Sequence, residues 1–244
     1  MEAIQAITDI DPRELQQISN GFERKTPEDV LRWGIEQFRG SITLACSFGA
    51  EDVALVDMIA RIDPSVPVFY LDTDYLFDET LEVRDRMAAR YGIHPLPVKP
   101  LQTIEEQTAR HGTDLFARQP DLCCKIRKVE PLRRHLGGFH AWITGIRRDQ
   151  APTRASAGLV EWDRIFGLVK LNPMARWTWD DVWSYIHAHD VPYNTLHDRN
   201  YPSIGCQPCT RPVLPGEDPR AGRWANFAKK ECGLHTEEGP SRPL

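Results

Sequence analysis

The sequence lacks any long apolar run among its 244 residues. A helix that spans a bilayer needs about 20 consecutive apolar residues, so we expect no transmembrane helix. The first 15 residues are acidic and polar and lack the basic and apolar regions of a signal peptide, so we expect a cytoplasmic protein. Internal repeats and low-complexity segments are also missing, which is typical of a globular chain with one or two domains.

An excess of positive charge is lacking as well. Lysine and arginine number 30 against 35 aspartate and glutamate residues, which gives a net charge of -5. This balance argues against broad binding to nucleic acids or to membrane surfaces, although local basic clusters remain compatible with it. We therefore expect neither nucleic acid nor membrane as a partner. The oligomeric state stays open, a homo-oligomer included.

Hydrophobic periodicity predicts an α/β fold, with a mostly parallel twisted sheet flanked by helices. Strands that alternate with helical patterns of about 10–15 residues are typical of such sheets. Short apolar strands are expected at 41–46, 66–71, 93–98, 141–146 and 168–173. Helices are expected at 11–20, 26–38, 52–62, 79–92, 101–112 and 177–190. We expect residues 1–195 to form this domain, with a helical region at its N-terminal end.

The character of the sequence changes in the last fifty or so residues. Residues 201–223 are rich in proline, glycine and arginine and show no periodicity. A long loop in a compact protein is usually functional or mobile, and the three cysteines in this part of the chain favour function. A short helix is expected at 224–233 and a disordered tail at 236–244. We expect residues 196–244 to form a cysteine-containing loop and a mobile C-terminal tail that pack on the same domain.

The six cysteines are unevenly placed, at positions 46, 123, 124, 206, 209 and 232. Adjacent cysteines cannot close a relaxed disulfide, and thiols normally stay reduced in the cytosol. The CC pair and the CxxC motif together supply four thiolates for one metal centre, and ligand chemistry alone leaves zinc and iron–sulfur both open. A thioredoxin-like redox pair is less compatible, because that motif opens a helix after a strand. Cys46 is expected to pack as a small buried thiol.

Loops that follow predicted strands carry groups that bind anions. After the first strand, Ser47 and Gly49 precede a helix, whose N-terminal N–H groups and dipole would form an anion cradle. An ordinary turn is the alternative, since the GxxxxGK[ST] pattern is absent. Another strand ends at Gly145 and is followed by three arginines, at positions 147, 148 and 154, which suit a phosphate or sulfate group.

Three further segments carry polar or reactive groups. The second strand delivers Asp72, Thr73 and Asp74 to the same edge of the sheet, where ligands of α/β proteins bind, although Thr73 or Asp74 could simply cap a helix. Five cations follow the CC pair, at positions 125, 127, 128, 133 and 134. Without the cysteines, such a run would indicate a solvated helix face. Cys232 follows two lysines, at positions 229 and 230, which favour a nucleophilic thiolate, whereas Glu231 opposes it. An incidental free thiol is the alternative.

Together these motifs resemble one family, the assimilatory phosphosulfate reductases, and within it the iron–sulfur adenylyl-sulfate (APS) reductases. The resemblance covers about residues 25–235 and rests on SFGAEDV, LDTDYLFDET, CCKIRK, TGIRRDQAPTR, YPSIGCQPCT and ECGLH, in the family's order. It implies an adenine-nucleotide α-hydrolase-like fold with a modified PP-loop. It also implies an oxidoreductase of sulfate assimilation and cysteine biosynthesis, which uses reduced thioredoxin to convert APS to sulfite and AMP through an enzyme S-sulfocysteine.

The resemblance also implies roles for individual residues. Cys232 would be the nucleophile, with His235 and Lys128 as further catalytic residues. The ligands of one 4Fe–4S cluster per chain would be Cys123, Cys124, Cys206 and Cys209. The residues that bind substrate would be Ser47, Phe48, Gly49, Asp52, Leu71, Asp72, Thr73, Gly145, Arg147, Arg148, Arg220 and Arg223.

Alternatives remain at this point. The sequence reads LDTDYLF where many relatives have LDTGRLF, so Asp74 and Tyr75 leave open whether APS, its 3′-phosphorylated form PAPS, or both are reduced. A PP-loop ATP pyrophosphatase or ligase is more remote, because such enzymes usually carry SGGxDS and would leave ECGLH unexplained. A non-catalytic zinc module would also use four thiolates, but it would be colourless, whereas an iron–sulfur protein is brown.

Overall fold

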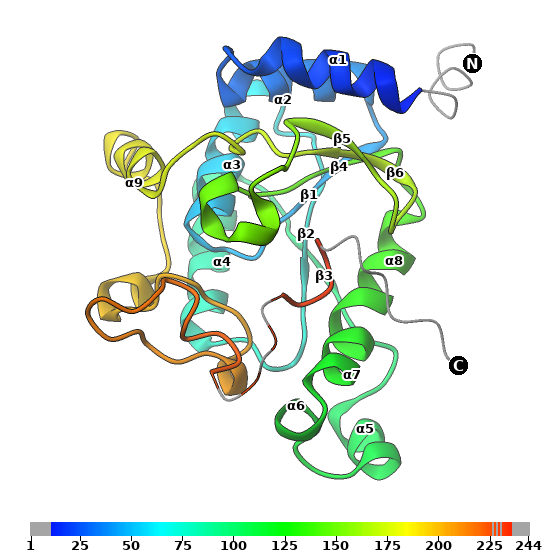
Figure 1. Ribbon diagram of the computed structural model, residues 1–244, viewed down its shortest axis with the longest axis vertical. Helices are drawn as coiled ribbons and strands as arrows, with labels where there is room; N and C mark the ends of the chain where they lie inside the picture. Colours follow the sequence, from blue (N-terminus) through cyan, green and yellow to red (C-terminus); the bar gives the residue numbers. More distant parts are fainter. Residues whose placement is uncertain (1–10, 226, 228, 230, 236–244) are drawn as a thin grey trace.

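Short apolar segments of the sequence form one six-stranded sheet in the order β3-β2-β1-β4-β6-β5 (Figure 1). The computed structural model describes residues 11–225, 227, 229 and 231–235, so the tail at 236–244 and Lys230 lie outside the described residues. The strands are β1 (Ile42–Ala45), β2 (Val68–Leu71), β3 (Leu96–Val98), β4 (Ala141–Ile143), β5 (Val160–Asp163) and β6 (Leu168–Leu171). The helices are α1 (Pro12–Phe22), α2 (Pro27–Gln37), α3 (Ala50–Ile62), α4 (Asp78–Tyr91), α5 (Ile104–His111), α6 (Leu115–Arg118), α7 (Pro120–Cys124), α8 (Glu130–Leu136) and α9 (Trp179–Ala188).

The sheet is parallel apart from one edge strand. In its centre, Leu44 of β1 lies opposite Val68 of β2 on one side and Ile143 of β4 on the other. The outer strand β5 runs antiparallel to β6. A mostly parallel sheet with helices between its strands is the α/β fold that the sequence predicts, and the prediction is confirmed.

Two helices begin with a capping box. The Thr26 side chain accepts a hydrogen bond from the backbone N–H of Asp29, whose carboxylate accepts one from the Thr26 N–H in return. Thr178 and Asp181 form the same capping box at the start of α9. Each box satisfies backbone donors that the first helical turn leaves unpaired, which fixes where these helices begin.

Side chains that alternate along the strands divide the core into two layers. Ile143 of β4 belongs to the larger layer, which contains residues of α2, α3, α4 and α9. The neighbouring Trp142 points to the opposite face of the sheet and packs in a layer with Leu132 and Leu136 of α8. Leu234 from the C-terminal segment joins this second layer. Figure 1 shows this segment (red) near the strands and α8.

The structure contains elements that the sequence-based prediction lacks, among them the helices α6, α7 and α8. Strand β5 has no predicted counterpart, because its pattern VEWD is short and half polar. The CC pair ends α7 and runs into a π-helical turn, Lys125–Val129, of a kind often found at functional sites. The helix expected at 224–233 is absent from its described residues, which form turns, bends and irregular chain; residues 226, 228 and 230 lie outside the described part.

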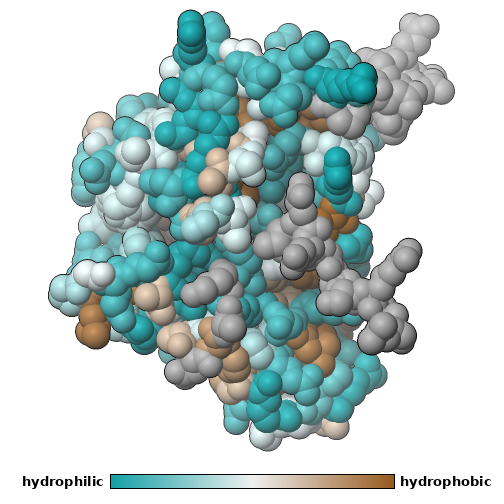
Figure 2. All heavy atoms as spheres, in the orientation of Figure 1, coloured by the Kyte–Doolittle hydropathy of each residue, from teal (hydrophilic) through white to brown (hydrophobic). Residues whose placement is uncertain are grey.

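The surface drawn in Figure 2 is mostly hydrophilic, and its apolar residues lie in small separate groups. Among the described residues, the exposed large hydrophobic side chains are Leu96, Leu101, Leu214 and Phe227. No helix in the described ranges is long and apolar enough to cross a membrane.

Candidate active site

A cleft with a volume of about 580 Å³ lies at the carboxyl ends of β1, β2 and β4. The strand order reverses between β1 and β4, because the chain leaves β1 towards β2 and later returns to pair β4 on the other side. Ligands of open α/β sheets bind at such a switch point. Every residue that the sequence predicts for substrate binding and catalysis lines this cleft, except Asp72.

The loop between β1 and α3 has the shape of an anion cradle. Gly49 is the N-cap residue of α3 and offers no side-chain cap, so the N–H groups of the first helical turn remain available to a ligand. Phe48 adopts a φ of 59°, which bulky residues rarely do. Its buried ring packs edge-on against Tyr70, with 5.6 Å between the ring centroids, and this contact holds the loop in place.

Asp52, in the first turn of α3, closes this loop. Its Oδ2 accepts hydrogen bonds from the backbone N (2.6 Å) and Oγ (2.5 Å) of Ser47. Burial raises the pKa of Asp52 to about 6 in spite of these bonds. The neighbouring strand approaches closely here: a Cβ on Gly145 would lie only 2.9 Å from the Cβ of Glu51, so the position requires glycine.

Replacing Asp52 with asparagine should change how stability depends on pH. A carboxyl group with a raised pKa destabilises the fold while it is ionised, and this cost disappears as the pH falls from about 6 to the unfolded value of 3.8. The wild type should therefore gain about 2 kcal/mol relative to Asp52→Asn between about pH 7.5 and pH 4. Urea unfolding of both proteins across this range measures the gain. A difference that stays constant with pH would show that the Asp52 pKa is not raised.

Two arginines that follow β4 line the cleft, but carboxylates already hold their guanidinium groups. Arg147 Nε donates to Glu51 Oε1 at 2.9 Å, and its Nη1 contacts Asp149. Arg148 forms a bidentate pair with Glu23, at 3.1 and 2.5 Å. These pairs fix the loop after β4 against α3 and α1. A direct role of either arginine in substrate binding stays a prediction.

Two other cations of the cleft, Lys128 and Arg223, form no ion pair with a carboxylate in the described part of the chain. Arg223 Nη1 donates to Ser203 Oγ at 3.0 Å, while its buried Nε has no hydrogen-bond partner. Burial lowers the pKa of Lys128, but nearby cysteines, Cys206 first among them, raise it more, so the ammonium group stays charged. These two side chains are therefore available to an anionic ligand.

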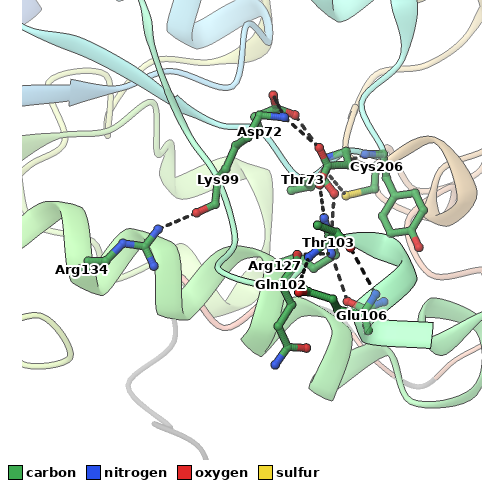
Figure 3. Close-up of polar contacts among 12 residues, drawn as sticks. Asp72, Thr73, Lys99, Gln102, Thr103, Glu106, Arg127, Arg134 and Cys206 are labelled. Carbon is green, nitrogen blue, oxygen red and sulfur yellow. Dashed lines mark hydrogen bonds and ion pairs between the residues drawn. The ribbon is translucent and has the colours of Figure 1, made fainter. Parts of the chain in front are cut away.

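The loop after β2 is fixed by its neighbours on both sides (Figure 3). Thr73 Oγ1 lies 3.3 Å from Cys206 Sγ, which joins the loop to the CxxC segment. On the other side, the Asp72 carboxylate forms an ion pair with Lys99 at 3.1 Å. The Asp72 carboxylate is thus held by Lys99, and Asp72 does not line the cleft.

A buried arginine, Arg127, binds the loop after β2 through hydrogen bonds to Thr73 and Asp74. It is 1% exposed, its Nε donates to the Thr73 carbonyl at 2.6 Å, and its Nη2 contacts the Asp74 carboxylate. Asp74 has a φ of 58°, a left-handed conformation that glycine adopts freely and aspartate tolerates better than most residues. The change from LDTG to LDTD therefore preserves the backbone and adds a partner for Arg127.

The four cysteines of the CC and CxxC motifs line one small cavity beside the cleft. Burial raises the pKa of Cys123 to about 12 and that of Cys124 to about 11, and also raises that of Cys209. Among the described residues, no three histidine, cysteine or acidic side chains are grouped as ligands of a single metal ion. Three buried thiols and the half-buried thiol of Cys209, with the cation Lys128 on the same cavity, form a donor set that suits a thiolate-bound cluster.

Three residues line both the cleft and the cysteine cavity: Lys128, Cys206 and Trp224. Trp224 is buried with a φ of 47°, and its backbone N donates to the Cys209 carbonyl at 3.0 Å. The Arg223 guanidinium lies over its ring, 4.7 Å from the centroid. These side chains therefore form the wall between the two spaces.

The C-terminal segment brings Cys232 and His235 into the cleft. His235 stacks on Trp142, with 5.8 Å between the ring centroids and 16° between the planes. Burial first, and then nearby cations, hold the pKa of His235 well below its usual range, so the imidazole is neutral. Its buried Nδ1 has no hydrogen-bond partner. The sequence indicates that the negative charge of Glu231 opposes a thiolate at Cys232. In the structure, the Glu231 carboxylate forms ion pairs with Arg154 and Arg220.

Sequence reasoning missed Arg127, Trp142 and Trp224 as parts of this site. In the sequence, Arg127 belongs to a run of charged residues, Trp142 to a predicted strand and Trp224 to the start of a predicted helix. The positions became visible only through contacts between segments far apart in the chain. The motif CCKIRK was the one signal that could have singled out Arg127, since it places the arginine next to Lys128.

Comparison with known proteins identifies the family of the chain. Residues 41–212 match the phosphoadenosine phosphosulfate reductase domain. The adenosine 5'-phosphosulfate reductase of Halalkalibacterium halodurans is 48% identical over 222 residues, which cover 91% of this chain and 96% of the relative. The phosphoadenosine 5'-phosphosulfate reductase of Gloeobacter violaceus is 47% identical over 229 residues, covering 93% and 95%.

A solved structure is similar as well. The phosphoadenylyl-sulfate (PAPS) reductase of Candida auris, crystallised as a phosphate complex, superposes with a TM-score of 0.74 at 30% sequence identity. The match covers 83% of this chain and 98% of the Candida chain. The motifs, the fold and these relatives lead to one conclusion: the chain belongs to the phosphoadenosine phosphosulfate reductase family.

Proposed function

We propose that this chain reduces APS to sulfite and AMP in sulfate assimilation, with a reduced thioredoxin as the electron donor. The observation that carries the proposal is the placement of one thiol, Cys232, in the same cleft as an anion cradle and the cations Lys128 and Arg223. The name of the Halalkalibacterium relative supports APS as the substrate.

The chemistry is written as two displacements at sulfur. The Cys232 thiolate attacks the sulfur atom of the sulfate group; an S–S bond forms, the bond from sulfur to the phosphate oxygen breaks, and AMP leaves with the electron pair. A thioredoxin thiolate then attacks the Cys232 sulfur and releases sulfite. The second thioredoxin thiol resolves the mixed disulfide, which regenerates Cys232 and oxidises thioredoxin to its disulfide. The two electrons gained by the sulfate sulfur come from the thioredoxin dithiol.

The residues around the cleft would bind and orient an anionic substrate. The backbone N–H groups at the start of α3 would donate to the phosphate or sulfate oxygens. The Ser47 hydroxyl donates to Asp52 in the structure and would have to exchange that hydrogen bond for one to the substrate. Lys128, Arg220 and Arg223 would neutralise charge that develops on AMP as it leaves. His235 is neutral, and its unpartnered Nδ1 would form a hydrogen bond to the substrate. The loop of Leu71 and Thr73 would contact the nucleoside.

We also propose that one 4Fe–4S cluster per chain is held by Cys123, Cys124, Cys206 and Cys209. The cavity that all four thiols line supports this assignment. When bound, the cluster would supply structural cross-links and a fixed electrostatic environment beside Lys128, while the electrons for sulfate reduction come from thioredoxin.

PAPS is the second candidate substrate. The names of the Gloeobacter and Candida relatives favour it, since both are PAPS reductases. The loop after β2 does not exclude it, because the added carboxylate of Asp74 is paired with Arg127 and Lys99.

The function is tested by intact mass after incubation with APS or PAPS. The reduced protein should gain one SO₃ on Cys232 with APS, and reduced thioredoxin should remove it. A faster gain with PAPS would favour the second candidate. ATP–pyrophosphate exchange without any mass gain would instead identify an ATP pyrophosphatase and reject both.

Three remaining predictions belong with this function. A thiol-based reduction suits the reducing cytoplasm, and all six cysteines are free thiols in the structure. Division of the chain into a nucleotide-binding domain, 1–195, and a catalytic loop and tail, 196–244, stays a proposal. Size-exclusion chromatography with light scattering would determine whether the chain forms a homo-oligomer.

A further inference from the structure

The residue before Cys232 is a buried carboxylate with four hydrogen bonds. Glu231 is 9% exposed, and Arg154 donates to it twice, from Nε at 3.0 Å and from Nη2 at 2.8 Å. Thr153 Oγ1 donates at 3.0 Å, and Arg220 Nη2 donates at 3.2 Å. A bidentate arginine–carboxylate pair with these further donors is among the strongest polar contacts that side chains form, and burial shields it from water.

The partners of Glu231 connect the tail to the rigid part of the cleft. Arg154 Nη1 donates to Gln150 Oε1 at 2.6 Å. Gln150 Nε2 in turn donates to Glu51 Oε1, at 2.9 Å, in the first turn of α3. The carboxylate therefore joins the C-terminal segment, through the loop after β4, to the helix that forms the anion cradle.

The chain on the other side of Cys232 is held by apolar contacts. Leu234 packs into the layer that contains Trp142 and Leu132, and His235 stacks on the Trp142 ring. Cys232 thus lies between an ionic attachment one residue before it and an apolar attachment two and three residues after it. Two attachments this close fix both the position and the direction of a short backbone segment.

We propose that Glu231 is a positioning residue that seats the Cys232 thiol in the cleft through its ion pairs with Arg154 and Arg220. The inference rests on the proposed function, because the seated thiol is the one that attacks the substrate. A two-step reaction needs the tail seated for attack on APS and accessible for thioredoxin. A buried ionic contact suits this need, since it is strong while dry and weakens once water enters.

Glu231 is poorly suited to act as a general base that deprotonates Cys232. Its oxygens already accept four hydrogen bonds from cationic or hydroxyl donors. Burial raises its pKa, but the hydrogen bonds and charge of Arg154 outweigh this, so the net pKa is lowered. A carboxylate held in this way is a poor proton acceptor, and its contribution is the position of the tail.

The test measures two properties of Cys232 in the holoenzyme. One is the single-turnover rate of S-sulfocysteine formation across a range of APS concentrations, followed by intact mass. The other is the rate at which N-ethylmaleimide alkylates Cys232 without substrate, followed by peptide mass mapping. Glu231→Gln loses charge-assisted hydrogen bonds, so it should slow S-sulfocysteine formation about ten- to a hundredfold, with little change in the half-saturating APS concentration. The same variant should speed alkylation of Cys232 severalfold, because the tail is less firmly held.

Three further variants sharpen the test. Thr153→Val removes one hydrogen bond to Glu231 and changes no residue that lines the cleft, so it should shift both rates in the same directions by a smaller factor. The double variant Arg154→Gln/Glu231→Gln should form the S-sulfocysteine no more slowly than the slower of the two single variants. The two substitutions break the same contact, so their effects should not add. Glu217→Gln, which breaks an ion pair with Arg211 in the preceding loop, should leave both rates unchanged.

The outcomes separate this inference from the proposed function. If Glu231→Gln forms the S-sulfocysteine and is alkylated at wild-type rates, the inference is overturned. The proposed function is still upheld in that case, provided that the wild type forms the S-sulfocysteine. If the wild type forms no adduct on Cys232, the function fails, and the alkylation rates still decide whether Glu231 seats the tail. Should Glu231→Gln not fold, unchanged rates in Thr153→Val would overturn the inference.

Discussion

Replacing Cys232 with serine should abolish sulfite release and leave the absorption spectrum of the iron–sulfur cluster unchanged. A serine hydroxyl stays protonated at neutral pH and is a far weaker nucleophile towards sulfur than a thiolate. Removing a nucleophile that forms a covalent intermediate costs a large share of the rate, so we expect a loss of at least about a thousandfold. The measurement is sulfite release with APS and reduced thioredoxin, alongside the visible spectrum.

A second cysteine provides the control for this variant. Cys46 also lines the cleft but is 3% exposed, at the end of β1. Cys46→Ala should therefore keep most of the sulfite release. The serine variant should bind APS with near wild-type affinity, because Lys128, Arg223 and the cradle are intact. Turnover close to wild type in Cys232→Ser would remove this residue from the role of nucleophile.

The position of the cleft could be predicted because strand ends carry the motifs. Ser47, Thr73 and Gly145 each follow a predicted parallel strand, and parallel strands bring their carboxyl ends to one edge. Hydrophobic periodicity alone was enough to locate those strands. The fold class and the cleft followed from local patterns.

The ionic partners could not be predicted, because each depends on contacts between distant segments. Arg148 pairs with Glu23 across 125 residues of sequence, and Arg127 reaches Thr73 across 54. A list of arginines in a motif does not say which ones carboxylates already occupy. The sequence thus predicted a cluster of cations at the cleft, but the structure was needed to distinguish Lys128 and Arg223 from the paired arginines.

The cysteine cavity contains both a feature that the sequence predicts and a feature that it does not. The spacing of CC and CxxC was enough to predict one centre with four thiols. The wall that separates it from the cleft depends on Trp224, whose left-handed backbone breaks the helical pattern expected there. No local preference predicts such a conformation for tryptophan, because it arises from packing against Arg223 and the Cys209 carbonyl.

Replacing Cys209 with serine should bleach the protein and destabilise it. Cys209 is the most accessible of the four cysteines, since Cys123, Cys124 and Cys206 are buried. A hydroxyl is a poor ligand for iron, and three remaining thiolates would hold the cluster weakly at an opened cavity. Because a bound metal centre contributes its binding free energy to the folded state, its loss should cost on the order of several kcal/mol.

Iron content, visible absorption and thermal unfolding of the same preparation measure this effect. Cys46→Ala, which removes a buried thiol outside the cavity, should retain iron and colour and so control for general damage to the fold. Full colour in Cys209→Ser would remove this residue from the ligand set. Bleaching with no change in the unfolding temperature would show that the cluster does not support the fold, and a colourless wild type that contains zinc would replace the cluster with a zinc site. The expected result, bleaching together with a lower unfolding temperature, would show that a cluster bound by the four thiols supports the fold.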